Sequence, residues 1–299
     1  MHITHIITSL SDGGAEAVLY RLCTNDTHAK HTVISLMDMG KYGLMLQEAG
    51  IEVHCLNMPS GRVTFSGLHI LYKLLKQLQP NAVQTWMYHA DLIGGVVAKF
   101  AGIKNINWGI HHTTLEKGKT RRSTFIVVKS CAFLSKFIPK RIICCANESY
   151  AVHSKLGYRK EKLTVAYNGH VIEQFVNDES LAADIKNELN ISNQTFNIGM
   201  VGRFDPQKDH FNLVSALEDL KNKKLNFKCF LVGSNLNYEN KSLVGYINTR
   251  DLQNHIILLN QRSDIPAFMN TIDIHVLSSA YGEAFPNVLC EAMACGTPC

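Results

Sequence analysis

Short apolar runs alternate with longer amphipathic segments along the whole chain, and this alternation limits the possible folds more than any other feature. Each run has the length of a buried strand, and each longer segment has the period of a helix with one apolar face. Repeated strand–helix units of this kind build a parallel sheet covered by helices. The sequence therefore predicts an α/β protein.

The expected elements fall into two series. In the first, strands are expected at 2–8, 31–36, 51–56, 82–85, 105–110, 141–146 and 163–166, and helices at 15–24, 42–49, 66–78, 90–101, 122–137 and 149–156. A polar stretch, 168–194, holds one short helix-like segment. The second series has strands expected at 197–201, 228–232, 256–259 and 273–277, with helices at 211–221, 243–250, 265–269 and 286–294.

A chain of 299 residues has room for two domains of ordinary size. We therefore predict two Rossmann-like domains, residues 1–170 and residues 171–299. The second series stops where a further strand should begin, so we expect the second domain to be incomplete.

Composition narrows the class of protein. The net charge of +5 is mild, so nothing predicts a nucleic-acid partner. Nine cysteines form no CxxC pair and mostly stand in apolar runs, which is typical of reduced, buried thiols in the cytoplasm. The first residues resemble a strand rather than a signal peptide, and no apolar run reaches the roughly 20 residues of a membrane span.

Gly13 and Gly14 stand in a turn between the first expected strand and helix, within SDGGAE. Backbone N–H groups and the positive end of the helix dipole meet at such a turn, which suits a phosphate. The glycines are adjacent rather than spaced as in GxGxxG, so NAD-type binding is not predicted. Taken alone, this pair is more often a structural turn.

Arg203 and Lys208 lie five residues apart in VGRFDPQKDH, directly after an expected strand. Both cations can converge on one anion while the glycine lets the backbone approach, and a diphosphate is the natural ligand. The alternative is a solvated basic loop.

Glu283 and Glu291 frame the segment GEAFPNVLCEAMACGTP. Pro286 suits the first turn of a helix and Gly296 its C-terminal cap, so Glu291 is expected inside the helix and Glu283 in the loop before it. Two carboxylates eight positions apart can bind hydroxyls of one extended ligand, such as a ribose and a sugar. The apolar neighbours of Glu291 favour a functional role over a solvated surface.

These motifs resemble those of the retaining glycosyltransferase family 4 enzymes, which have the two-domain GT-B architecture. Glu283 and Glu291 resemble the family's E-x7-E motif, although Ala284 replaces the usual glycine. Arg203 and Lys208 stand where its GR-x4-K motif places the cations for the donor diphosphate.

Landmarks of the first domain agree with this resemblance. Gly13 and Gly14 resemble part of the family's GGAE loop, and Asn168 and Gly169 resemble the turn that ends its first domain. These landmarks, in the correct order over nearly the whole chain, are together more specific than any one of them.

The resemblance implies roles for these residues. Glu291 would bind the nucleotide ribose and Glu283 the hydroxyls of the donor sugar. Arg203 and Lys208 would stabilise the leaving nucleoside diphosphate in place of a metal ion, so no metal and no other cofactor is expected. The helix start at Phe285, Pro286 and Asn287 would contribute to donor binding.

His111 and His112 end an expected strand, at the edge where α/β sheets bind ligands. The family often has a histidine here that faces the transferred sugar. We favour His112, because the following Thr113 fits the pattern better. A lone histidine is more often structural.

Residues 117–141 include eight basic residues and no acidic one among many apolar residues. Such a segment can lie on an anionic membrane surface, which would make the protein peripheral to the inner face of the cytoplasmic membrane. The alternative is a packed helix with a solvated basic face.

The resulting hypothesis is a retaining glycosyltransferase. It would transfer a sugar from a UDP- or GDP-linked donor to a lipid-linked or oligosaccharide acceptor in the assembly of surface polysaccharide, either capsule or lipopolysaccharide. The alternatives are a non-catalytic nucleotide-sugar-binding fragment of such an enzyme and a sugar-nucleotide epimerase of the same architecture.

Overall fold

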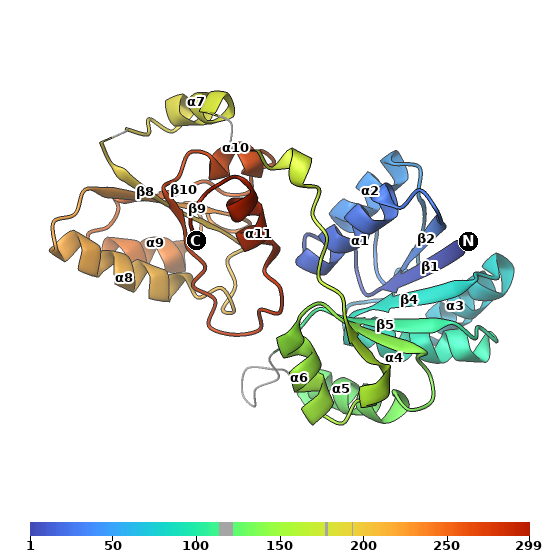
Figure 1. Cartoon of the computed structure of the whole chain (residues 1–299). Helices are drawn as coiled ribbons and strands as arrows, with labels where there is room; N and C mark the ends of the chain where they lie inside the picture. The colour runs from blue at the N-terminus through green and yellow to red at the C-terminus, as the bar shows by residue number, and fades with distance from the viewer. Residues whose placement is uncertain (114–121, 177–178, 193) are drawn as a thin grey trace. The chain divides into compact units, whose positions relative to one another are not determined.

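The computed structural model describes residues 1–113, 122–176, 179–192 and 194–299, which form two compact units (Figure 1). The first unit comprises Met1–Gly169 together with the short segment Glu283–Phe285, and the second comprises His170–Gly282 and Pro286–Cys299. Sequence reasoning did not anticipate that Glu283–Phe285 would pack with the first unit.

The first unit is built on a parallel sheet of seven strands in the order β3-β2-β1-β4-β5-β6-β7. The strands are β1 (His2–Ile7), β2 (Lys30–Ser35), β3 (Glu52–Cys55), β4 (Ala82–Trp86), β5 (Ile106–Ile110), β6 (Arg141–Cys144) and β7 (Leu163–Val165). The helices are α1 (Gly14–Asn25), α2 (Gly40–Glu48), α3 (Phe65–Leu78), α4 (Met87–Phe100), α5 (Arg122–Leu134) and α6 (Asn147–Lys155), with a 3-10 turn at Lys160–Lys162. The strand order reverses between β1 and β4, which is where such sheets bind ligands.

The second unit has a parallel sheet in the order β10-β9-β8-β11. Its strands are β8 (Phe196–Val201), β9 (Phe227–Val232), β10 (Ile256–Leu258) and β11 (Ile274–His275). Its helices are α7 (Glu179–Glu188), α8 (His210–Asn222), α9 (Lys241–Asn248), α10 (Ile265–Met269) and α11 (Asn287–Ala294), with a 3-10 turn at Ile172–Gln174.

Every strand and helix expected from the sequence is present, and the differences lie at their ends. α4 begins at Met87, three residues earlier than expected, because it follows β4 with no intervening loop. α5 ends at Leu134 rather than at residue 137. Pro286 precedes α11 as its N-cap instead of standing in its first turn.

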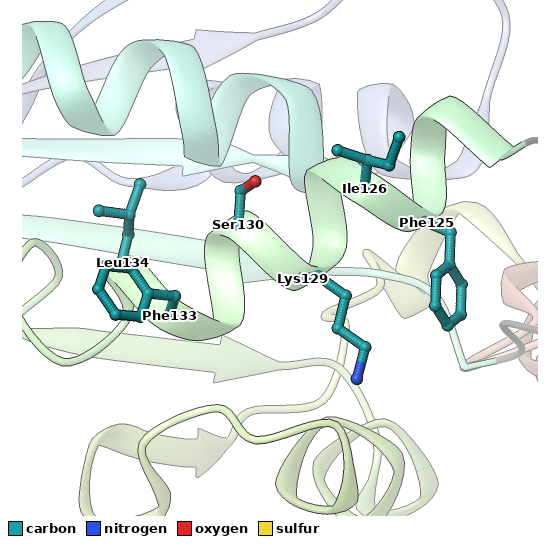
Figure 2. Close-up of a pocket in the computed structure, with 6 residues that line it drawn as sticks. All are labelled: Phe125, Ile126, Lys129, Ser130, Phe133 and Leu134. Carbon is teal, nitrogen blue, oxygen red and sulfur yellow. The ribbon is translucent and has the colours of Figure 1, made fainter.

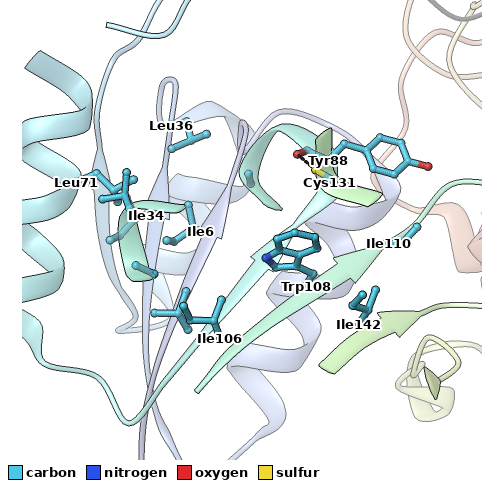
Figure 3. Close-up of a cluster of buried hydrophobic side chains, with 14 of the residues drawn as sticks. Ile6, Ile34, Leu36, Leu71, Tyr88, Ile106, Trp108, Ile110, Cys131 and Ile142 are labelled. Atoms are coloured by element: carbon cyan, nitrogen blue, oxygen red, sulfur yellow. Dashed lines mark hydrogen bonds between the residues drawn. The ribbon is translucent and has the colours of Figure 1, made fainter. Parts of the chain in front are cut away.

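The larger core cluster of the first unit lies between the sheet and α3, α4 and α5, and a smaller cluster includes residues of α1 and α2. Ile6, Ile106 and Trp108 are fully buried in the larger cluster (Figure 3). On α4, a β-carbon at Gly95 would meet the indole Nε1 of Trp108, so glycine allows the helix to approach the sheet closely. Because α4 contacts the sheet, α3 and α5, it is apolar on most of its surface.

Two general features bear on function. None of the helices in the described ranges is both long and apolar enough to cross a bilayer. The nine cysteines are free thiols, and six of them are buried, in agreement with the apolar runs in which they stand.

Candidate functional site

The candidate residues of the first unit follow the carboxyl ends of β1 and β5, at one edge of the sheet. Gly13 is the N-cap of α1 and has an extended backbone without a side-chain cap. A β-carbon at Gly13 would collide with the Glu16 carboxylate, which therefore lies over the first turn of the helix. An anion at Gly13 and Gly14 would therefore meet the negative charge of this carboxylate.

The start of α2 packs against the backbone at Leu10, in the loop that leads to Gly13 and Gly14. Gly40 has φ of +50°, and a β-carbon there would overlap the backbone of Leu10. The N–H of Tyr42 also donates to the Leu10 carbonyl at 2.9 Å. Close backbone packing of this kind fixes the path of the chain that leads to Gly13.

The junction between β4 and α4 is a feature of the site that the sequence did not reveal. Met87 has φ of +71°, a left-handed conformation that is rare for a side chain of this kind. The sharp turn places Trp86 at the end of the strand and Tyr88 in the first turn of the helix. Unusual backbone at a ligand-binding edge of a sheet is often functional.

The two candidate histidines have different surroundings. The His111 ring stacks on Trp86, with centroids 5.0 Å apart and planes inclined by 13°, and burial lowers the pKa of His111 to about 4. The His112 ring lies edge-on to Tyr88, with centroids 6.4 Å apart, and its carbonyl accepts from the Ser149 hydroxyl. Both rings are half-buried at the end of β5.

The neighbours of His112 are held by a second set of hydrogen bonds. His153 Nδ1 lies 2.7 Å from the Ser149 carbonyl, so Nδ1 carries the proton and Nε2 accepts from the Tyr88 hydroxyl, also at 2.7 Å. Burial, the largest cause, lowers the pKa of His153 to about 4. The His153 ring is therefore neutral, and its hydrogen bond holds Tyr88, whose ring contacts His112, in place.

Glu283 and Phe285 contact residues of the same unit. The Thr113 hydroxyl donates to the carbonyl of Glu283 at 2.7 Å. The Phe285 ring lies 5.9 Å from that of Tyr167, whose hydroxyl accepts from the Asn147 amide. The structure thus brings the backbone of Glu283 into contact with Thr113, the residue that follows His112, a relation that no local pattern could show.

A chain of hydrogen bonds supports Trp86 from inside the unit. Trp86 Nε1 can only donate, so His5 Nδ1 accepts from it at 3.2 Å and His5 Nε2 must carry the proton. That proton is donated to His31 Nδ1 at 2.9 Å, and His31 Nε2 lies 3.2 Å from the Asp26 carboxylate. Burial, the largest cause, lowers the pKa of His5 to about 3, so its ring stays neutral.

Within the described residues, His5, His31 and Cys23 form the one group close enough to hold a metal ion. Their chemistry fits the hydrogen-bond chain better. Both nitrogens of His5 are already used, and burial raises the pKa of the Cys23 thiol to about 12, whereas a metal needs the thiolate. We therefore assign this group to positioning Trp86.

In the second unit, Arg203 and Lys208 stand in the loop between β8 and α8. The Asp205 side chain accepts from the N–H of Gln207 at 2.9 Å and lies 3.6 Å from the Arg203 guanidinium. Asp209, in the left-handed conformation, caps α8 by accepting from Asn212. The loop therefore has a defined shape that presents both cations at the carboxyl edge.

Neighbouring loops at the same edge hold this loop in place. Gly233, which follows β9, has φ of +149°, and a β-carbon there would overlap the carbonyl of Gly202. The Ser278 hydroxyl donates to the carbonyl of Lys208 at 2.7 Å, and the N–H of Ala280 donates to that of Gln207 at 2.9 Å. Loops after β8, β9 and β11 thus meet around the cations.

Lys208 also acts on two buried histidines. Burial, followed by the charge of Lys208, lowers the pKa of His210 and of His275 to about 4. His275 Nε2 accepts from the N–H of Val201 at 3.2 Å, as a neutral ring can. The positive charge at this edge therefore comes from Lys208 and Arg203 and not from the histidines.

Glu291 lies half-buried in α11, the helix that Pro286 and Asn287 open. The C-terminal end has the expected glycine cap. Gly296 has φ of +78°, its N–H donates to Met293, and the N–H of the following residue donates to Ala292. The position of Glu291 inside a short, capped helix is as the sequence indicated.

The geometry suits ligands with anionic and hydroxyl groups. The second unit offers two cations with a helix N-terminus and an interior carboxylate, and the first offers the neutral His111 ring, His112 and aromatic rings at its sheet edge. Such groups stabilise a departing anion and bind a polar ring.

Comparisons with known proteins are consistent across the chain. The sequence model of Glycosyltransferase Family 4 matches residues 12–174, and that of Glycosyl transferases group 1 matches residues 181–299. The UDP-Gal:alpha-D-GlcNAc-diphosphoundecaprenol alpha-1,3-galactosyltransferase of Escherichia coli is 29% identical over 234 residues, which are 77% of this chain and 59% of that protein. The capsular polysaccharide biosynthesis glycosyltransferase CapM of Staphylococcus aureus is 25% identical over 266 residues, 82% of this chain and 65% of CapM.

The chain therefore spans less than two thirds of the length of either relative. Among solved structures, Anabaena HepE in complex with UDP and glucose matches with a TM-score of 0.87 and 23% identity, covering 100% of this chain and 79% of HepE. This likeness confirms the predicted fold of two Rossmann-like units of the GT-B type.

Proposed function

We propose that this chain, which belongs to glycosyltransferase family 4, transfers a sugar from a nucleoside diphosphate donor to a saccharide acceptor with retention of configuration. The observation that carries the proposal is the loop of Arg203 and Lys208, fixed by two neighbouring loops at the carboxyl edge of its sheet. The loop places two cations where a diphosphate leaving group can be stabilised. The E-x7-E pair of Glu283 and Glu291 adds hydroxyl-binding carboxylates.

Five of the candidate residues have a defined role in this proposal. Arg203 and Lys208 bind the diphosphate, and Glu291 binds the ribose of the nucleotide. Glu283 binds hydroxyls of the donor sugar, and His112 faces the transferred sugar. Because the positive charge is built into the protein, the reaction needs neither a metal ion nor another cofactor.

The donor and the acceptor are proposed from the relatives. The name of the E. coli relative specifies a UDP-linked donor and a lipid-diphosphate acceptor, and HepE was solved with UDP and glucose. CapM is named for capsular polysaccharide biosynthesis. We therefore assign to this chain a UDP-linked hexose or N-acetylhexosamine donor and a lipid-linked saccharide acceptor in surface polysaccharide assembly, at the inner face of the cytoplasmic membrane.

Release of nucleoside diphosphate tests the proposal. The purified protein is incubated with UDP-, GDP- and ADP-sugars, with and without lipid-linked acceptor extracted from membranes. We expect acceptor-dependent release from a UDP-sugar, and a loss of about 10²- to 10³-fold in kcat in Lys208→Ala. Lys224→Ala, an exposed lysine of the same unit, is the matched control and should keep full activity.

The outcomes separate the alternatives. If the protein binds UDP but releases no nucleoside diphosphate from any sugar donor, the result would favour a non-catalytic binding module and contradict the transferase proposal. A change of the donor sugar into its epimer without transfer would indicate an epimerase. Full activity in Lys208→Ala would remove the cation loop from the mechanism.

A further inference from the structure

The exposed face of α5 combines apolar and basic side chains. Ile126 and Phe133 have 66% and 63% of their surface exposed, and Phe137, just beyond the helix, has 61%. Lys129 and Lys136 are also exposed, and they stand between these apolar residues in the sequence. Folding normally hides large apolar side chains, so three on one basic face indicate a contact with something outside the chain.

A shallow groove of about 520 Å³ runs along this face (Figure 2). It is lined by residues of α5 alone, with Phe125 and Ile126 at one end, Lys129 in the middle, and Phe133 at the other. The Lys129 ammonium lies 5.8 Å from the centre of the Phe125 ring. The groove is therefore an apolar hollow with a cation at its centre.

The helix is firmly fixed to the first unit. Val128, Cys131 and Ala132 are buried on its opposite face. At its C-terminal end, Lys162 donates to the carbonyls of Ser135 and Lys136, each at 2.9 Å. The exposed stripe is thus a rigid surface rather than a frayed end.

The charge around this face is strongly one-sided. Residues 53–147 contain thirteen lysines and arginines and two acidic residues, Asp91 and Glu116. Glu116 lies outside the described residues, as do Lys117, Lys119 and Arg121 of the basic segment. Asp91 is completely buried, and its carboxyl group accepts a hydrogen bond from the Thr85 hydroxyl at 2.5 Å. Burial raises the pKa of Asp91 well above the usual range. On α3, α4 and α5, as far as the structure describes them, no ionised carboxylate offsets the cations.

We propose that the exposed surface of α5 and of the turn after it, formed by Ile126, Lys129, Phe133, Lys136 and Phe137, docks on the headgroup layer of an anionic bilayer. The lysines lie at the level of the lipid phosphates, and the apolar side chains enter the acyl boundary between them. A nucleic acid would satisfy the cations but leave the apolar side chains in water. The combination of both kinds of side chain therefore favours lipid.

This surface deepens the proposed function, because a lipid-linked acceptor is held in a bilayer, but its test does not depend on catalysis. Binding is measured by sedimentation with vesicles of phosphatidylcholine alone and with phosphatidylglycerol added. We expect binding to the anionic vesicles that weakens as salt is added, and little binding to phosphatidylcholine alone.

Two double variants test the two kinds of side chain. Ile126→Ser with Phe133→Ser, and separately Lys129→Glu with Lys136→Glu, should each weaken binding about tenfold or more. Tyr238→Ser with Lys241→Glu, an exposed pair in the second unit, is the matched control and should bind like the wild type. Thermal unfolding of every variant confirms that it is folded.

Several results would overturn the docking surface. These are equal binding to neutral and anionic vesicles, no binding to either, or unchanged binding in the serine variant. Tight binding of an oligonucleotide that only the glutamate variant abolishes would indicate a nucleic acid instead. UDP release with acceptor dispersed in detergent, where no bilayer is present, should be unaffected in both α5 variants, so failure of docking and failure of the transferase proposal give different results.

Discussion

The indole of Trp86 and the imidazole of His111 stack nearly in parallel, whereas the adjacent His112 lies edge-on to Tyr88. His111 is thus part of the wall of the site, supported by Trp86 and the hydrogen-bond chain behind it. His112 is the histidine assigned to the transferred sugar, and the two roles can be separated by experiment.

We expect His111→Ala to lower the melting temperature, because it removes a stacked ring, which is worth about 0.5–1.5 kcal/mol beyond the area it buries. His112→Ala should instead lower kcat by about 10²-fold or more with a smaller effect on melting. Calorimetry and donor turnover on both variants make the comparison. The reverse pattern would transfer the catalytic role to His111.

The two glutamates are expected to act on different parts of the donor. Glu291→Gln should weaken UDP binding about 10- to 100-fold, because hydrogen bonds to a charged group contribute about 1.5–3 kcal/mol. Glu283→Gln should leave UDP binding nearly unchanged and lower turnover of the UDP-sugar. Titration calorimetry with UDP distinguishes them, with the exposed Glu239→Gln as control. Equal loss of UDP affinity in both variants would contradict the assignment.

Gly233→Ala should destabilise the second unit by at least about 2 kcal/mol. The position has φ of +149°, and its β-carbon would overlap the Gly202 carbonyl, so the backbone of both loops must shift. Gly245→Ala in α9 meets open space and is the control, with a neutral or stabilising effect. Urea unfolding measures both, and a stable Gly233→Ala variant would show that the loops do not depend on this contact.

Stability should fall as the pH drops from about 6.5 to 4. Burial lowers the pKa of five histidines to about 3 or 4: His5, His111, His153, His210 and His275. In that window the unfolded chain binds protons that the folded chain does not, so each histidine lowers stability by up to about 1.4 kcal/mol per pH unit. Asp91 has the opposite effect. Because its pKa is raised in the folded state, the folded chain binds one proton there before the unfolded chain does, which opposes the loss of stability.

Urea midpoints at pH 8, 7, 6 and 5 measure this dependence. The midpoint should be nearly constant between pH 8 and 7, which serves as the internal control, and should decline below pH 6.5. A midpoint that stays level down to pH 5 would mean that these histidines are accessible to protons in the folded state.

Removal of divalent metal ions should leave donor cleavage within about twofold of its original rate, because Arg203 and Lys208 supply the positive charge. The assay compares protein dialysed against EDTA with protein supplied with Mg²⁺ or Mn²⁺. A metal-dependent glycosyltransferase treated in parallel shows that the chelation worked. Activity that is lost and then restored by metal would require a cation at the diphosphate.

The sequence alone predicted the strands and helices and the order of the motifs along the chain. Buried strands such as β9 and amphipathic helices such as α3 have periods that depend only on neighbouring residues. The cation loop and α11 were found the same way, because a strand, a turn residue and a helix cap are local signals. Gly296 in its left-handed conformation is the plainest example.

Other features of the site depend on contacts between distant residues. The pair of His5 and His31 requires β1 and β2 to be neighbours in a known register. The junction at Met87 depends on a backbone conformation that methionine rarely adopts, so no residue type marks it. The hydrogen bond from Thr113 to Glu283 joins positions 170 residues apart. Local patterns contain no information about such pairs.

The segment Glu283–Phe285 has a consequence for anyone who builds hybrid enzymes from this family. The sequence suggests Gly169 as the point at which to join halves of two proteins. A hybrid joined there would combine Glu283 of this chain with the first half of another protein, and so without the Thr113 that it contacts here. A hybrid that keeps Thr113 and Tyr167 together with Glu283–Phe285 preserves the contacts made here and is the better design.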